Sequence, residues 1–232
     1  MGMVRDGFEI VEAFIPSELV NTALLELENS EELYSMCGVR NAEAKFKFVG
    51  RICASEFVQG KLKQYLPGKA QLVRAIVFDK TLESNWFVAW HQDKTVALSE
   101  KMEMPGWGPW SVKDGVVHVQ PPLQVLENML TFRIHLDPAG KKNGCLKVVP
   151  KSHEIGVIDQ NEIASIVESS EVRFCEIGAG GAVLMRPHIL HSSSKSKSGG
   201  HRRVLHLEYS NYQLESGLKW AASITKRKAP IS

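Results

Sequence analysis

The sequence predicts a mainly-β fold with an N-terminal helical cap, in the form of a β-sandwich or jelly roll. Apolar residues in positions 1–69 recur at helical spacing, whereas from residue 70 onward short apolar runs alternate with turn residues. Many short strands at regular intervals are typical of sandwiches and jelly rolls. With 232 residues, 44% of them apolar, the chain is long enough to bury its own core as one domain.

The first part, residues 1–69, is expected to form a mainly helical support for the sheets. Pro16 and Ser17 begin an amphipathic helix that is expected to end near Leu33. A second helix is expected to begin near Ser55 and to stop at the Pro-Gly pair at 67–68.

The second part, residues 70–211, is expected to form the jelly-roll core. Its candidate strands are apolar runs between turns, at 71–79, 86–92, 129–136, 145–149, 172–176, 182–186 and 203–209. A short helix is expected at 161–167. Residues 212–232 are expected to form a C-terminal tail, with a solvated basic cluster at 226–228.

The stretch 100–122 fits neither pattern, since it contains Trp107 and Trp110 among four prolines and three glycines. A loop longer than about 15 residues inside a compact domain is usually functional. We expect a mobile lid over the active site, with the two tryptophans facing the substrate. The alternative is an Ω-loop held together by its own aromatic residues.

Composition excludes several classes of protein. A net charge of +2 is too balanced for a nucleic-acid-binding surface, and no apolar run is long enough for a membrane span. The N-terminal residues lack the basic-then-apolar pattern of a signal peptide, and the four cysteines (37, 53, 145 and 175) include no C-x-x-C pair. We therefore expect a cytoplasmic protein with reduced thiols and a small-molecule partner. The oligomeric state is not indicated.

Two separated segments carry residues suited to metal chemistry. His91 and Asp93 lie two positions apart at the end of a candidate strand, so that both side chains face one side. A hundred residues later, a strand runs into a Pro turn that delivers His188 and His191 to a loop. Two histidines and one carboxylate on one face form the facial triad of non-haem Fe(II) oxygenases. The nearby Arg202 suits the distal carboxylate of 2-oxoglutarate.

These residues resemble the phytanoyl-CoA dioxygenase-like branch of the Fe(II)/2-oxoglutarate oxygenases. The matching pieces occur in order at 90–93 (Trp-His-Gln-Asp), 143–146 (Asn-Gly-Cys-Leu), 149–153 (Val-Pro-Lys-Ser-His), 190–193 (Leu-His-Ser-Ser) and 202–203 (Arg-Arg). The resemblance covers roughly residues 70–210 and implies a double-stranded β-helix, the jelly roll of the cupin type. One departure is Lys151, which stands where the family usually has glycine.

The resemblance implies a role for each matched residue. His91, Asp93 and His191 would be the iron ligands, with His188 as the alternative to His191 and otherwise a residue behind the ligands. Arg202 would bind the distal carboxylate of 2-oxoglutarate, and Ser193 would add a hydrogen bond. Arg203 is the alternative to Arg202, because strand alternation places only one of the two inside.

The implied cofactors are Fe(II), 2-oxoglutarate and O₂, and the implied reaction is hydroxylation of an aliphatic C–H bond with release of succinate and CO₂. One alternative is a cupin-like metal enzyme that uses no 2-oxoglutarate, which Arg202 disfavours. The other is a non-catalytic jelly-roll binding domain, which the intact triad disfavours.

Polar residues in apolar strands suggest the nature of the substrate. Arg133 and His135 share one strand face with Thr131, and Arg74 interrupts the apolar run 72–78. Charged groups are rarely buried in strands without a partner. We expect these residues to line the pocket together with the two tryptophans of 100–122, and the substrate to be anionic. The alternative for Arg74 is a salt bridge with a glutamate.

Overall fold

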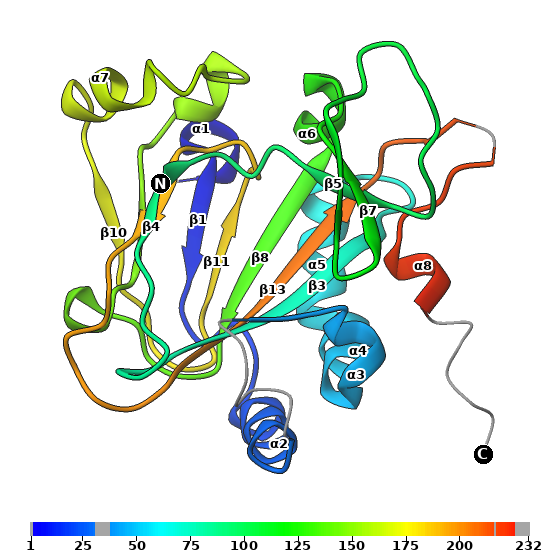
Figure 1. Ribbon diagram of the computed structural model, residues 1–232. Coiled ribbons are helices and arrows are strands. Elements are labelled where there is room, and N and C mark those ends of the chain that lie inside the picture. The colour runs from blue at the N-terminus through cyan, green and yellow to red at the C-terminus, as the bar shows by residue number, and fades with distance from the viewer. Residues whose placement is uncertain (1, 31–37, 216, 226–232) are drawn as a thin grey trace, which may run out of the picture.

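An antiparallel sheet of six strands is the largest feature of the computed structural model, and extends from β1 to β3 across Figure 1. The structure describes residues 2–30, 38–215 and 217–225. In spatial order, the strands of this large sheet are β1 (Phe8–Val11), β11 (Ala182–Met185), β8 (Met129–His135), β13 (Arg202–Ser210), β3 (Gln71–Lys80) and β2 (Gly38–Arg40). Strands β3, β8, β11 and β13 agree within one residue with predicted strands. The sequence patterns missed β1 and β2, which lie in the mainly helical part.

A smaller antiparallel sheet forms the second layer. Its strands are, in order, β10 (Arg173–Cys175), β9 (Leu146–Val148), β12 (His191–Ser193) and β4 (Val88–His91). Side chains of β4, β9 and β12 line a cavity together with side chains of β3, β8 and β13 from the large sheet. Two facing antiparallel sheets around a cavity confirm the jelly-roll prediction. Within the described residues the two sheets are not joined into a closed barrel.

Strand alternation gives the large sheet one apolar face and one face toward the cavity. On β13, Leu205 and Leu207 belong to the main apolar core, whereas Arg202 and His206 line the cavity. The same alternation on β8 turns Arg133 toward the cavity. Because successive side chains of a strand point to opposite faces, a single register decides which polar residues reach the site.

Helices cover the apolar face of the large sheet. Helix α2 (Ser17–Glu28) begins where the Pro-Ser pair predicts, and α5 (Glu56–Tyr65) begins after Ser55, whose hydroxyl accepts a hydrogen bond from the backbone N–H of Val58 (3.5 Å). Their apolar side chains join those of α4 (Lys47–Ala54) in the main core. The predicted end of the first helix near Leu33 lies outside the described residues.

The remaining helices are short. They are α1 (Met3–Asp6), α3 (Ala42–Lys45), α6 (Leu123–Glu127), α7 (Ile163–Glu168) and α8 (Ala222–Thr225), with 3₁₀ turns at Lys141–Asn143 and Ser152–Ile155. Helix α7 confirms the short helix predicted at 161–167. No helix in the described ranges combines the length and the apolar character that a bilayer crossing requires.

Residues 100–122 differ from the predicted loop, because they contain a β-hairpin. Strand β7 (Val116–Val119) pairs with both β6 (Trp110–Lys113) and β5 (Val96–Leu98) in a third sheet, drawn in green in Figure 1. The hairpin turns at Asp114 (φ 50°) and Gly115 (φ 74°), and Asp-Gly is a strong signal for such a two-residue turn. The sequence analysis overlooked this signal among the surrounding prolines and glycines.

The C-terminal segment also differs from the expected tail. Trp220 is buried and forms an isolated bridge with Leu98, and α8 packs near β3. Residues 217–225 therefore cover part of the third sheet. The basic cluster at 226–228 lies outside the described residues, as does Cys37. The other three cysteines form no disulfide.

Candidate metal centre

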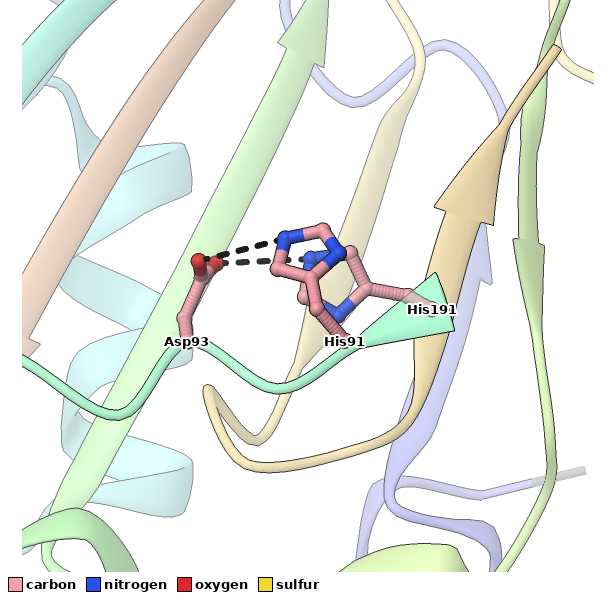
Figure 2. Close-up of side chains that lie close together, drawn as sticks. All are labelled: His91, Asp93 and His191. Atoms are coloured by element: carbon pink, nitrogen blue, oxygen red, sulfur yellow. Dashed lines mark ion pairs between the residues drawn. The ribbon is translucent and has the colours of Figure 1, made fainter. Parts of the chain in front are cut away.

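His91, Asp93 and His191 converge at one end of the cavity. Figure 2 shows His91 at the end of β4, Asp93 on the segment that follows, and His191 on β12. Asp93 Oδ1 lies 3.7 Å from His91 Nε2, and Asp93 Oδ2 lies 3.5 Å from His191 Nε2. One ligand atom from each residue lies within 4.8 Å of the other two. The structure thus brings together the three residues that the spacing suggested.

Backbone carbonyls fix the orientation of both imidazole rings. His91 Nδ1 lies 2.8 Å from the carbonyl oxygen of Ala89, and His191 Nδ1 lies 2.9 Å from that of Ile189. Because a carbonyl oxygen only accepts hydrogen bonds, each Nδ1 must carry the proton. When Nε2 carries no proton, each ring therefore presents its lone pair toward Asp93, which is the orientation of histidines that bind metals in proteins.

The protonation states suit a metal-binding site. Burial disfavours the carboxylate of Asp93, but the adjoining imidazoles of His191 and His91 outweigh it and hold the pKa of Asp93 well below its usual value. Burial lowers the pKa of His191, so that its ring is neutral. For His91 burial also disfavours the cation, but the hydrogen bond and charge of Asp93 leave its pKa raised. A divalent cation would replace the proton on His91 Nε2.

Two residues that the sequence patterns did not single out hold the candidate ligands in place. Gln92, between the two first ligands, turns away from the cavity, and its amide nitrogen donates to the carbonyl oxygens of His188 (2.6 Å) and Gly156 (2.7 Å). The hydroxyl of Ser152 accepts a hydrogen bond from the backbone N–H of Leu190 (2.8 Å), next to His191. The Val-Pro-Lys-Ser-His turn thus positions the distal histidine.

His188 does not belong to the triad. Its ring lies 6.1 Å from that of His153, outside the cavity, and burial lowers its pKa to about 4. The backbone next to His188 instead helps to position Asp93, because the carbonyl oxygen of Pro187 accepts a hydrogen bond from the N–H of Asp93 (2.9 Å). Of the two alternatives for the distal ligand, the structure brings His191 to the site.

The two consecutive arginines have opposite environments. Arg203 lies on the apolar side of the sheet, where its Nε and Nη2 donate to the carboxylate of Asp137 (2.8 and 2.9 Å). Arg202 lines the cavity with 3% of its surface exposed, and its Nε and Nη1 have no partner among the described residues. Burial, together with the charge of Arg133, lowers the pKa of Arg202 to about 10. The buried guanidinium therefore has room for an anion.

Ser193 and Lys80 lie beside Arg202. The buried Lys80, opposite Arg202 in the β13–β3 register, donates through Nζ to Ser193 Oγ (2.9 Å) and to the Ser194 carbonyl oxygen (2.8 Å). Because the Ser193 oxygen already accepts this hydrogen bond, its own proton can be donated to a ligand. Sequence patterns gave no reason to select Lys80, because it ends an ordinary strand. The oxygen atoms that it contacts belong to residues far away in the sequence, in β12 and directly after it.

A chain of buried polar groups forms the cavity floor. Arg74 Nη2 donates to Glu208 Oε1 (2.6 Å), which also lies 3.0 Å from His206 Nε2, and Arg133 Nη1 donates to His206 Nδ1 (3.2 Å). Arg74 thus has the glutamate partner considered as its alternative. Neither His206 nor Glu208 was among the residues predicted to line the pocket. Ligand atoms of Asp93, His206 and Glu208 also lie within 4.8 Å of one another.

Three of the residues expected in the substrate pocket lie elsewhere. Trp107 and Trp110 pack in an apolar cluster with Leu98 and Trp220 and are not among the cavity-lining residues. His135 is fully buried and also lies outside the cavity lining, and neither of its ring nitrogens has a partner among the described residues. Burial holds its pKa well below the usual value. Arg74 and Arg133 do line the cavity, whose volume is about 240 Å³.

Comparison with known proteins places this geometry in a family. The family profile "Phytanoyl-CoA dioxygenase (PhyH)" matches residues 3–204. No curated protein sequence matches the chain.

Solved structures share the fold at low sequence identity. The crystal structure of AviO1 from Streptomyces viridochromogenes Tue57 is 18% identical, with a TM-score of 0.65 over 90% of this chain and 91% of that chain. HygX from Streptomyces hygroscopicus, with nickel and 2-oxoglutarate bound, is 15% identical, with a TM-score of 0.63 over 90% and 83%. The epimerase SnoN, in complex with Fe3+, alpha ketoglutarate and nogalamycin RO, is 15% identical, with a TM-score of 0.68 over 94% and 82%. The family match over most of its length shows that the chain belongs to the phytanoyl-CoA dioxygenase family.

Proposed function

We propose that this protein is an Fe(II)- and 2-oxoglutarate-dependent oxygenase that hydroxylates an aliphatic C–H bond of a small substrate and releases succinate and CO₂. The observation that carries the proposal is the combination of two features in one cavity. Three metal-ligating side chains converge at one end, and the buried Arg202 has two guanidinium nitrogens without protein partners. Family membership and the 2-oxoglutarate bound to HygX support the same function.

The donor set fits iron. Two imidazole nitrogens and one carboxylate on one side leave the remaining positions of a six-coordinate metal open, as non-haem Fe(II) oxygenases require. Adjacent ligand atoms around an octahedral metal with bonds of about 2.1 Å lie about 3 Å apart. The distances of 3.5 and 3.7 Å from the imidazole nitrogens to Asp93 approach this value, so that small side-chain shifts would complete the site.

The residues of the cavity would have separate tasks in this reaction. His91, Asp93 and His191 would hold the metal, which with 2-oxoglutarate supplies the oxidising chemistry. Arg202 would bind the distal carboxylate of 2-oxoglutarate through its planar fork, and the Ser193 hydroxyl would donate to the same group. Apolar side chains from β3 and β4 would exclude water from the other side.

We include a cover for the cavity in this proposal. Lys113, at the tip of the β6–β7 hairpin, lines the cavity, and the adjacent Asp114 accepts a hydrogen bond from Arg40 (2.7 Å). The hairpin would act as the lid expected of residues 100–122, although its tryptophans pack away from the cavity. Closing such a lid would keep water from the reacting centre.

The test loads the protein anaerobically with Fe(II) and 2-oxoglutarate, admits O₂, and measures succinate while small metabolites are screened. We expect succinate from the wild type and at least a hundredfold less from His191→Ala. The matched control His201→Ala alters a histidine that pairs with Asp79 outside the cavity and should keep wild-type turnover. A product with one added oxygen would identify hydroxylation, whereas a product of unchanged mass would indicate an epimerase, the activity ascribed to SnoN.

The outcomes separate the alternatives. Iron binding without 2-oxoglutarate consumption would indicate a cupin-like enzyme that uses no 2-oxoglutarate. Absence of both iron binding and turnover would indicate a non-catalytic binding domain.

A further inference from the structure

We propose that Arg133 anchors an acidic group of the substrate, so that this enzyme acts on a small organic anion. This inference rests on the proposed function, because it assigns a substrate class to the same cavity. The buried hydrogen bonds on the cavity floor show which of its charged groups are already paired.

Hydrogen-bond direction fixes the charge of His206. A guanidinium group only donates, so His206 Nδ1, 3.2 Å from Arg133 Nη1, must be the acceptor. The proton of a neutral ring then sits on Nε2 and is donated to Glu208 Oε1 (3.0 Å). His206 therefore offers Arg133 a lone pair but no negative charge.

The only carboxylate in this chain of groups is already matched. Arg74 Nη2 lies 2.6 Å from Glu208 Oε1, and the two side chains form a buried ion pair. Arg74, which the sequence suggested as a substrate ligand, is thereby neutralised by protein. The charge that remains on the floor is the positive charge of Arg133.

Arg133 has no salt-bridge partner among the described residues, and the carboxylate whose charge acts on it is that of Asp93, a candidate metal ligand. Among the described residues no carboxylate forms a salt bridge with it, and its Nε has no hydrogen-bond partner. Its other contact is the ring of Phe78, whose centroid lies 5.7 Å away. Only 9% of Arg133 is exposed, and this burial lowers its pKa. An unpaired buried cation is unfavourable, and it becomes favourable when an anion enters the cavity that it lines.

In the proposed function both carboxylates of 2-oxoglutarate would have partners other than Arg133. One would bind at the metal, where it and Asp93 would balance the charge of Fe(II), and the other would bind Arg202. The anion for Arg133 must then belong to a third molecule, the substrate, and the cavity volume of about 240 Å³ restricts that substrate to a small one. Carboxylate, sulfonate and phosphate groups all match the planar fork of a guanidinium.

The test measures anion binding to the full chain loaded with Mn(II), a redox-stable substitute for Fe(II), and with saturating 2-oxoglutarate. The probes are methanesulfonate, a poor metal ligand, and its uncharged counterpart dimethyl sulfone. Calorimetric titration at constant ionic strength should show saturable methanesulfonate binding and no dimethyl sulfone binding. Arg133→Gln should weaken methanesulfonate binding about tenfold or more, and Arg133→Lys should weaken it less. Both variants should keep their affinity for 2-oxoglutarate within about twofold.

The control variant is Arg173→Gln, which removes an exposed arginine on β10 that pairs with Glu171 and should change nothing. Absence of saturable methanesulfonate binding to the wild type would overturn the inference, as would equal binding to wild type and Arg133→Gln. A tenfold loss of 2-oxoglutarate affinity in Arg133→Gln would overturn it too, because Arg133 would then bind the co-substrate. If Arg133→Gln does not fold, Arg133→Lys and the two probes on the wild type decide. Failure of the wild type to bind 2-oxoglutarate would instead refute the proposed function.

Discussion

Replacing Arg202 with lysine separates the planar fork of the guanidinium from its charge. The side chain is 3% exposed and lies in the cavity, and Nε and Nη1 have no partner among the described residues. Lysine keeps the positive charge but is a point donor, so it loses one of two parallel hydrogen bonds to a carboxylate. Because no carboxylate among the described residues pairs with Arg202, the substitution should affect ligand binding much more than folding.

The expected loss follows from the value of one charged hydrogen bond. Such a bond contributes about 1.5–3 kcal/mol, and about 1.4 kcal/mol corresponds to a tenfold change in affinity. Arg202→Lys should therefore raise the Kd for 2-oxoglutarate roughly tenfold to a hundredfold. The neighbouring Lys80, which donates to Ser193, keeps some positive charge at this end of the cavity and places the effect toward the lower value.

The assay is an anaerobic calorimetric titration of the Fe(II)-loaded protein with 2-oxoglutarate, which measures the Kd. Arg203→Lys is the matched control. Its guanidinium pairs with Asp137 and Glu28 outside the cavity, so this change should leave the 2-oxoglutarate Kd within about twofold while lowering Tm. A large loss of 2-oxoglutarate affinity in Arg203→Lys with none in Arg202→Lys would refute the assignment of the two strand faces.

The remaining predictions concern stability and the lid. Gly144→Ala should destabilise the fold by about 2–3 kcal/mol in chemical denaturation, because φ is +73° and an added Cβ would overlap the Ser194 carbonyl oxygen. Lys151→Gly should stabilise it by up to about 1 kcal/mol, since Lys151 has a φ of 64°; a loss would contradict this reasoning. The pKa of His188 is about 4 in the folded protein and 6.5 in the unfolded chain, so the unfolded chain binds the proton more readily. The free energy of unfolding should therefore fall by about 3 kcal/mol as the pH is lowered from 6.5 to about 4. His188→Gln should flatten that part of the pH–stability curve, and an unchanged curve would exclude His188 as its source. Proteolysis within 100–122 should slow when Fe(II), 2-oxoglutarate and substrate are bound, and equal cleavage in free and loaded protein would argue against a lid.

The sequence predicted the strands best where an apolar run had a definite length and clear turns at both ends. Strands β3 and β13 are examples, and their alternation correctly separates Arg202 from Arg203. The third sheet was missed because its strands have three or four residues each, too few for a period of two to be visible. Burial of Trp220 on that sheet depends on a contact across more than a hundred residues, which no local pattern records.

The convergence of the three candidate ligands could be predicted because the motif places two of them on one strand end and the third after a Pro turn. Their supports could not. Ser152 and Gln92 act through backbone atoms of segments distant in sequence, and Lys80 reaches Ser193 across the two sheets. Such contacts depend on how the sheets face each other. The pairing of Glu208 with Arg74 also depends on the arrangement of the strands. This pairing leaves Arg133 as the arginine on the cavity floor that is available to bind an anion.

The most direct test of the central claim is an X-ray structure of the protein with Mn(II) and 2-oxoglutarate, with the metal located by anomalous scattering. We expect one anomalous peak bonded to His91 Nε2, Asp93 and His191 Nε2, and a 2-oxoglutarate whose distal carboxylate contacts Arg202. A peak bonded instead to His206 and Glu208 with Asp93, the other group of ligand atoms on the cavity wall, would contradict it. So would a 2-oxoglutarate that makes no contact with Arg202.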